Sequence, residues 1–154
     1  DAVFEMDCDF SHNPDDLLRL TAELEAGADV AVGSRYSKGV TVVNWPMSRL
    51  LMSYCASRYV RIVTGMPVCD ATAGFVGYKR EVLAAIDFDR IEMVGYGFQI
   101  EMKYTAWKMG FRIGEVPIIF ADRTEGTSKM SGGIFGEAFF GVLALPFRTI
   151  ARKK

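Results

Sequence analysis

The sequence contains few of the residues that most often build metal and nucleophile sites. Its 154 residues include one histidine, His12, which excludes a multi-histidine metal site and argues against a serine–histidine catalytic pair. The three cysteines, Cys8, Cys55 and Cys69, are widely spaced, match no metal-ligand pattern and do not suggest a disulfide framework. This cysteine usage is typical of a reducing compartment.

The chain also lacks a strong charge and a long apolar run. Its 18 basic and 19 acidic residues give a net charge of −1, so the sequence has no excess of positive charge that would indicate nucleic-acid binding. We find no signal peptide and no uninterrupted apolar stretch of about 18 residues, the length that indicates a transmembrane helix. With 50% hydrophobic residues, the chain suits one compact α/β domain.

An initiator methionine is absent as well. Asp1 borders an apolar run that we interpret as a buried strand. An α/β sheet does not normally begin with the strand that carries its metal ligands. We therefore expect further strands to precede this one.

The most informative motif is an Asp-x-Asp, Asp7 and Asp9, which follows this short apolar strand. Residues two apart in an extended backbone share a face, so both carboxylates should point the same way. Two such carboxylates repel each other unless a cation lies between them. Mg²⁺ or Mn²⁺ fits, because these ions bind one or two carboxylates together with substrate phosphates. The motif therefore predicts a metal-held diphosphate, with a solvated turn as the alternative.

Turn residues and periodicity divide the chain into alternating strands and helices. Asn13 and Pro14 favour a helix start, and Gly27 favours its end. Beyond it we expect strands at 29–33, 74–78 and 112–120 and helices at 47–64, 80–86, 98–109 and 134–151. Pro117 indicates that its strand lies at a sheet edge. This order predicts an α/β fold, a mixed, mostly parallel sheet with helices on its faces and ligands at the carboxyl ends of its strands.

Basic residues in loops are candidate phosphate ligands. Arg35 follows a strand, and Arg123 and Lys129 frame a glycine-bearing loop. Arginine binds phosphate as a bidentate fork and lysine as a point charge, so this loop could close over a diphosphate. A solvated surface loop is the alternative interpretation.

Polar residues in otherwise apolar segments are further candidates. Asp70 precedes a turn of small residues, where it could bind a sugar hydroxyl, act as a base or form an Asx-turn. Gln99 and Glu101 lie in an apolar helix, with an exposed face as the alternative. His12 follows the acid motif closely, and we favour capping or a water contact over metal ligation.

We expect residues 134–154 to form an amphipathic helix in the same domain as residues 1–133. Apolar residues would cover most of the circumference of this helix, and the segment ends in Arg148, Arg152, Lys153 and Lys154. Such a helix suits a membrane surface, with core packing or a partner contact as alternatives. Pro146 should kink or end it.

Together these motifs resemble the dolichol-phosphate (polyprenyl-phosphate) mannosyltransferase group of glycosyltransferase family 2, which has the GT-A fold. The similarity covers nearly the whole chain. Each motif alone is weak, but their order and spacing are specific. They occupy residues 6–14, 33–36, Asn44-Trp45 with Arg49, 70–75, 95–102, 114–118, 122–123 and 126–130.

The resemblance implies an enzyme that transfers mannose from GDP-mannose to a polyprenyl phosphate with inversion, using Mg²⁺ or Mn²⁺, peripherally on the cytoplasmic face of a membrane and without a nucleic-acid partner. It places Asp7 and Asp9 on the metal. By motif position it assigns catalysis to Asp9, Arg123 and Lys129; the donor to Asp7, Cys8, Asp9, Arg35, Arg123 and Lys129; the acceptor phosphate to Arg35, Arg49 and Ser53; and supporting roles to Asp70, Gln99 and Glu101.

Two departures from the family pattern matter. Cys8 replaces the usual small residue between the acids and adds a thiol near the metal. The family's N-terminal segment, which holds the guanosine, does not match any part of this chain. The chain therefore looks like the C-terminal two-thirds of the catalytic domain, without its N-terminal strands, and we expect the isolated piece to be inactive.

Three alternatives stay open. A related transferase could use a UDP-sugar donor. A haloacid-dehalogenase-type phosphatase also has a strand followed by Asp-x-Asp-x-Ser. A non-catalytic membrane-docking fragment would bind lipid without metal or nucleotide. The sequence does not determine the donor nucleotide, the lipid chain length or the oligomeric state.

Overall fold

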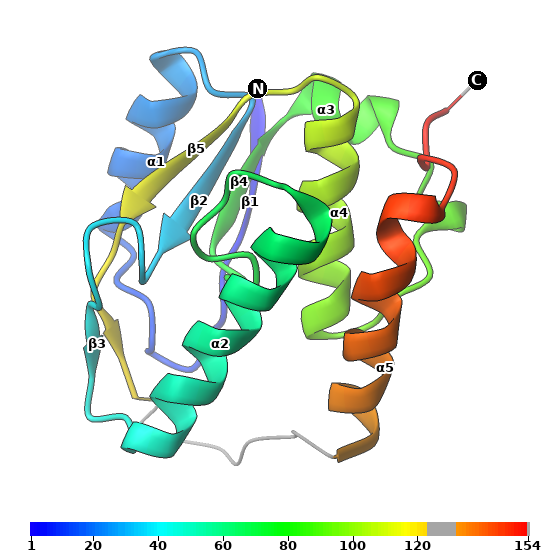
Figure 1. The fold of residues 1–154 in the computed structure, drawn as a ribbon. Helices are drawn as coiled ribbons and strands as arrows, with labels where there is room; N and C mark the ends of the chain where they lie inside the picture. The colour runs from blue at the N-terminus through cyan, green and yellow to red at the C-terminus, as the bar shows by residue number, and fades with distance from the viewer. Residues whose placement is uncertain (123–131, 154) are drawn as a thin grey trace.

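The computed structural model describes residues 1–122 and 132–153, in which strands alternate with helices (Figure 1). The elements in chain order are β1 Ala2–Glu5, α1 Asp16–Glu25, β2 Val30–Ser34, β3 Val42–Val43, α2 Met47–Thr64, β4 Val76–Lys79, α3 Arg80–Ala85, the 3-10 helix η1 Phe88–Arg90, α4 Tyr96–Lys108, β5 Ile113–Pro117, β6 Phe120–Ala121, α5 Gly132–Ala144 and the 3-10 helix η2 Leu145–Phe147.

Four strands form the central sheet in the order β1-β4-β2-β5, and β3 and β6 form a small parallel pair. β4 is antiparallel to both of its neighbours, whereas β2 is parallel to β5. Three strands therefore run one way and β4 runs the other way, which confirms the predicted mixed sheet. The edge position of β5 confirms the interpretation of Pro117.

The prediction that the first strand is buried is wrong. β1 pairs only with β4 and lies at the other edge of the described sheet. Three of its four residues are exposed, and Val3 keeps 56% of its surface in contact with solvent. An edge position explains this exposure, because a neighbouring strand covers only one side of β1.

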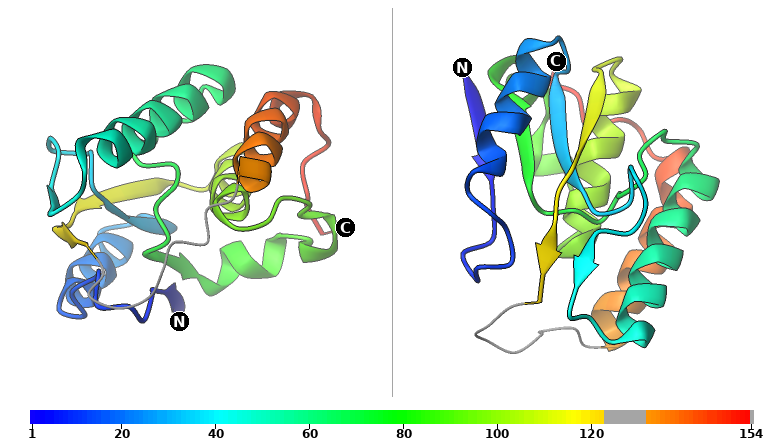
Figure 2. Two further views of the ribbon diagram at one scale, coloured as in Figure 1. Left: turned by 90° about the horizontal axis from the view of Figure 1, so that it is seen from below. Right: turned by 90° about the vertical axis from the view of Figure 1, so that its left-hand side faces the viewer.

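Helices cover both faces of the sheet, as the sequence predicts (Figure 2). On one face, Leu20 and Leu24 of α1 pack with Ala31 of β2. On the other face, Val30 and Val32 of the same strand pack with α3 and α4, because alternate strand residues face opposite ways. α2 and α5 contact each other and pack beyond α4.

The helix starts and stops follow local chemistry. α2 has the predicted bounds, 47–64, and Gly65 ends it in the left-handed region with φ 71°. α1 begins three residues later than Asn13, because Asn13 first closes a turn. Its side-chain oxygen accepts the Asp15 N–H at 3.1 Å, and its carbonyl accepts the Asp16 N–H at 3.1 Å.

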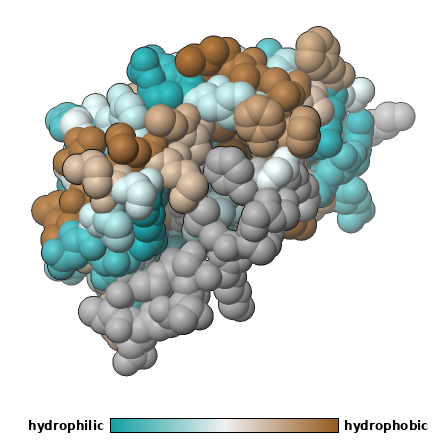
Figure 3. Space-filling model, turned by 60° about the horizontal axis from the view of Figure 1, so that its bottom comes forward, coloured by the Kyte–Doolittle hydropathy of each residue, from teal (hydrophilic) through white to brown (hydrophobic). Residues whose placement is uncertain are grey.

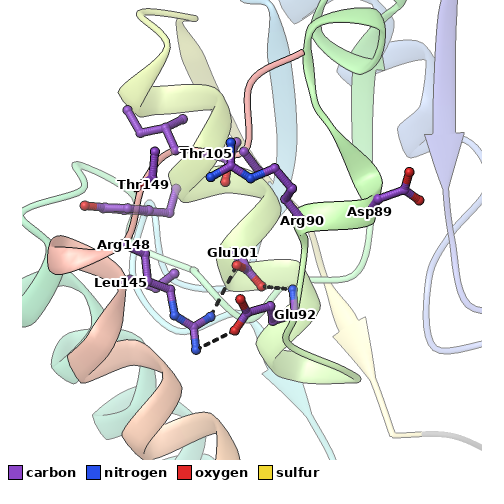
Figure 4. Close-up of a pocket in the computed structure, with 11 residues that line it drawn as sticks. Asp89, Arg90, Glu92, Glu101, Thr105, Leu145, Arg148 and Thr149 are labelled. Carbon is purple, nitrogen blue, oxygen red and sulfur yellow. Dashed lines mark hydrogen bonds and ion pairs between the residues drawn. The ribbon is translucent and has the colours of Figure 1, made fainter. Parts of the chain in front are cut away.

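The prediction of one helix over 134–154 is wrong in extent. α5 ends at Ala144 and a 3-10 turn follows, as expected from Pro146, so the basic residues lie beyond the helix. Arg148 turns back to Glu92 at 3.1 Å and to Glu101 at 3.5 Å (Figure 4). Over the described ranges, no helix combines the length and hydropathy needed to cross a bilayer.

Candidate active site at the carboxyl edge of the sheet

Several candidate residues lie close together where the parallel strands of the sheet end, at the bottom of Figure 1. We call this end of the sheet its carboxyl edge. β1, β2 and β5 run in the same direction and end there, and the reversed β4 begins there. Asp7 and Asp9 follow β1, Arg35 follows β2, and the turn that contains Asp70 leads into β4. Ligands of α/β sheets bind at this kind of edge.

The acid motif lies in a bend and not in a strand. β1 ends at Glu5, so the prediction that extended-strand alternation aligns Asp7 and Asp9 is wrong. Phe10 has φ 63°, and a non-glycine residue in this region is strained by about 1–3 kcal/mol. The carboxylate of Asp9 accepts hydrogen bonds from the Ser11 N–H, at 3.1 Å, and from the Ser11 hydroxyl. The strained bend thus fixes the direction of Asp9.

Asp7 faces the turn that leads into β4. A Cβ atom added to Gly74 would lie 3.9 Å from Oδ2 of Asp7. Asp7 and Cys8 are both exposed, and Cys8 is a free thiol, as are the other two cysteines. The side chain of Asp7 is therefore accessible to a ligand at this edge.

His12 packs beneath the acids. Its ring lies 5.0 Å from the rings of Phe75 and Phe120, measured between centroids. Burial lowers the pKa of His12, although the two nearby acids oppose this shift. Within the described part of the chain its Nδ1 has no hydrogen-bond partner. Aromatic packing therefore replaces the capping role that the sequence suggested.

Arg35 is held by a buried carboxylate. Asp70, with no exposed surface, accepts hydrogen bonds from the Arg35 backbone N–H at 2.9 Å, Nε at 2.7 Å and Nη2 at 2.6 Å. Burial alone would lower the pKa of Arg35, but the hydrogen bonds and charge of Asp70 outweigh it and raise that pKa. Asp70 is thus the counterion of Arg35 in this structure, and its roles as a base or sugar ligand stay predictions.

Two arginines flank one indole ring. The guanidinium carbon of Arg49 lies 4.0 Å from the centroid of Trp45, and that of Arg35 lies 5.5 Å from it. Arg49 also pairs with Asp122 at 2.7 Å. The structure therefore brings Arg49 to the same region as Arg35, and both guanidinium groups lie near the Trp45 ring.

Ser53 joins this region through a tyrosine. Its hydroxyl accepts a hydrogen bond from the Tyr36 hydroxyl at 2.8 Å. The Tyr36 ring lies 5.3 Å from the guanidinium carbon of Arg35. The predicted acceptor residues Arg35, Arg49 and Ser53 are therefore linked by ring and hydroxyl contacts.

Gln99 and Glu101, the two candidate residues on α4, lie in different surroundings. Gln99 donates a hydrogen bond from Nε2 to Glu5 at 2.6 Å, near the end of β1. Glu101 accepts the N–H groups of Glu92 at 3.0 Å and Met93 at 2.8 Å. It lines a cavity of about 340 Å³ whose lining lacks the two acids and Arg35 (Figure 4). Gln99 is thus placed toward the site, and Glu101 belongs to a different cavity.

Arg123 and Lys129 lie outside the described residues. Within the described ranges, no three His, Cys, Asp or Glu side chains cluster as a metal cage. Two carboxylates are nevertheless enough for Mg²⁺ when phosphate oxygens and water complete the shell. Asp7 and Asp9 therefore fit a metal that binds together with a diphosphate.

One buried residue escaped the sequence interpretation. Lys103 of α4 has no exposed surface, and its ammonium donates to three carbonyls, two of them in the turn that contains Asp70. The only sequence signal was a lysine in a mostly apolar helix, which reads equally well as an exposed residue.

Comparison with known proteins assigns the sequence to a family. Residues 1–87 match the family described as Glycosyl transferase family 2. An undecaprenyl-phosphate mannosyltransferase of Micrococcus luteus is 48% identical over 142 residues, 92% of this chain and 58% of the relative. A polyprenol monophosphomannose synthase of Mycolicibacterium smegmatis is 49% identical over 140 residues, 91% of this chain and 53% of the relative.

A more distant relative is a dolichol-phosphate mannosyltransferase of Pyrococcus furiosus, 34% identical over 134 residues, 86% of this chain and 37% of the relative. The chain thus spans little more than half the length of the two more similar relatives and less of the third. The mixed sheet covered by helices agrees with the α/β GT-A fold expected for such proteins.

Proposed function

This chain belongs to glycosyl transferase family 2, and from that premise we propose that the protein transfers mannose from GDP-mannose to the phosphate of a polyprenyl lipid. The single observation that carries the proposal is the meeting of Asp7, Asp9 and Arg35 at the carboxyl edge of the sheet. The names of the relatives, all polyprenyl-phosphate or dolichol-phosphate mannose enzymes, supply the sugar and the acceptor.

The donor diphosphate is proposed to lie against the acid bend. Asp7 and Asp9 would hold Mg²⁺ or Mn²⁺, which supplies positive charge to the leaving diphosphate. Arg35, fixed by Asp70, presents a permanent cation at the same edge. A preorganised charge of this kind stabilises the developing anion without reorganising during the reaction.

The acceptor needs no strong base, because a lipid phosphate is already an anion. This agrees with the residues at the edge: Asp70 is occupied by Arg35, and burial lowers the pKa of His12. Catalysis would rest on positioning and charge. Arg49 and Ser53 are proposed for the lipid phosphate, and Arg123 and Lys129 for the reacting groups.

The lipid acceptor implies a membrane surface, and we place the protein peripherally on its cytoplasmic face. Exposed apolar side chains gather on α2 and α5, among them Met47, Leu51 and Phe140, and Figure 3 shows apolar groups on this end of the molecule. Tyr59 joins the two helices by stacking on Phe139 at 4.7 Å. Both helices, and not the last one alone, are thus proposed to dock.

The phosphatase alternative is wrong, because the chain belongs to a glycosyltransferase family. A UDP-sugar donor and a non-catalytic docking role are outcomes of the test. The assay incubates the intact protein with radiolabelled GDP-mannose, polyprenyl phosphate in vesicles and Mg²⁺ or Mn²⁺. We expect lipid-linked mannose, release of GDP only with the acceptor, and no product after EDTA. Transfer from UDP-sugars alone would refute GDP-mannose as the donor. Lipid binding without any sugar transfer would refute the proposed transferase activity.

A further inference from the structure

Lys103 is a charged side chain whose position in the core needs an explanation. Its three ammonium donors reach the carbonyls of Ala71 at 3.1 Å, Ala73 at 2.7 Å and Gln99 at 3.0 Å. Burying an ammonium is costly unless all of its hydrogens are bonded. Burial lowers the pKa of Lys103 to about 7, against the opposing effects of Asp70, Glu5 and Glu115, while Arg35 lowers it further.

A carboxylate holds the same turn by its amides. Glu115 of β5 accepts the Cys69 N–H at 2.8 Å and the Asp70 N–H at 3.1 Å. Residues 69–73 are therefore held by an anion at their amides and by a cation at their carbonyls. The anion comes from the sheet and the cation comes from α4, so the turn is fixed relative to both layers.

This turn carries the only carboxylate that the described residues place on Arg35. Any shift of the turn moves Asp70, and with it the guanidinium that Asp70 holds at 2.6 Å and 2.7 Å. Gly74, at the end of the same turn, faces Asp7. The turn therefore connects both charged sides of the proposed donor site.

We propose that Lys103 and Glu115 are positioning residues of the donor site, which hold the turn at residues 69–73 so that Asp70 fixes the Arg35 guanidinium where the donor diphosphate binds. The location of the diphosphate rests on the proposed function. The positioning of Arg35 does not, because it is a property of the protein without ligand.

The test uses Lys103→Met in the intact protein. Methionine has a similar length but no donors. The matched control is Lys108→Met on the same helix, where the lysine is exposed and lies over the rings of Tyr104 and Trp107. We expect Lys103→Met to lower kcat/KM for the donor between about tenfold and a hundredfold, the scale of a misplaced group, and the control to leave it unchanged.

A double-mutant cycle separates positioning from a structural role. In an Arg35→Ala background, Lys103→Met should change kcat/KM by less than about twofold, because the group that it positions is gone. The full loss in that background would overturn the proposal. A lowered melting temperature with unchanged kcat/KM would overturn it as well.

An NMR measurement tests the positioning without any activity. Solvent exchange of the Arg35 Nε–H should be slow in the wild type and in Lys108→Met, and faster in Lys103→Met. If the protein transfers no sugar but this difference appears, the proposed function fails and the positioning stands. If Lys103→Met does not fold, Glu115→Gln replaces it in this test. That change weakens the hydrogen bonds to the Cys69 and Asp70 N–H groups and should also speed the exchange of the Arg35 Nε–H. Unchanged exchange in a folded variant overturns the proposal.

Discussion

Replacing Asp70 by asparagine should show how strongly the site depends on its buried ion pair. The side chain of Asp70 has no exposed surface and that of Arg35 only 9%, and they meet at 2.6 Å. Asparagine keeps the shape but puts an NH₂ group against the guanidinium and leaves its charge uncompensated. Breaking a buried pair in this way costs about 3–5 kcal/mol of unfolding free energy.

For a chain of this size each kcal/mol corresponds to about 2–4 °C, so the melting temperature should fall by roughly 6–20 °C. Thermal and urea unfolding measure the effect. The matched control is Asp29→Asn, because Asp29 and Lys79 lie 3.6 Å apart with about a third of each side chain exposed. That change should cost less than about 1 kcal/mol. Equal small losses in both variants would refute the claim that Arg35 depends on Asp70.

Four further predictions concern the protonation of Lys103, the metal, the loop framed by Arg123 and Lys129, and the membrane. Burial lowers the pKa of Lys103 to about 7 from its usual 10.5, so the unfolded state binds more protons than the folded state between these pH values. Stability measured by urea unfolding should therefore rise with pH in this range, and Lys103→Met should flatten the rise. Asp9→Asn should abolish metal-dependent transfer without lowering the melting temperature by more than a few degrees, and wild-type activity in that variant would contradict the assignment. Lys129→Ala should lower turnover more than nucleotide affinity; equal losses would mean that the lysine binds only the ground state. Leu51→Asp on α2 should weaken sedimentation with anionic vesicles, whereas Leu18→Asp on α1, more exposed but across the sheet, should not.

The sequence predicted best where one local signal decides the structure. The bounds of α2 follow from helical periodicity and the stop at Gly65. Pro117 indicated the edge strand, and Pro146 indicated the end of the last helix. In each case the signal is local, because glycine and proline restrict the backbone at their own positions.

It failed where partners distant in sequence decide the structure. The ion pair between Asp70 and Arg35, 35 residues apart in the chain, was not predicted. The pairing of Arg148 with Glu92 and Glu101 was not predicted either. Such pairings depend on which layers meet, and periodicity carries no information about that.

The alignment of the two acids failed for a different reason. The prediction assumed that the strand continued through Asp9. The strand ends at Glu5 instead, and Phe10 has a positive φ of 63°. The acids still reach the predicted edge, because the end of β1 places them there. The sequence therefore predicted the end of the sheet at which the two acids lie, but not how they are arranged there.

We propose that this edge of the sheet binds a metal and a nucleoside diphosphate together. Paramagnetic broadening by Mn²⁺ with GDP, recorded on the amide signals of the intact protein, tests it most directly. We predict broadening at Ser11 and Gly74, beside the two acids, little effect at Thr105 in the separate cavity, and loss of the effect in Asp9→Asn. Broadening centred on Thr105, or broadening at Ser11 that survives in Asp9→Asn, would contradict a joint metal and diphosphate site at the two acids.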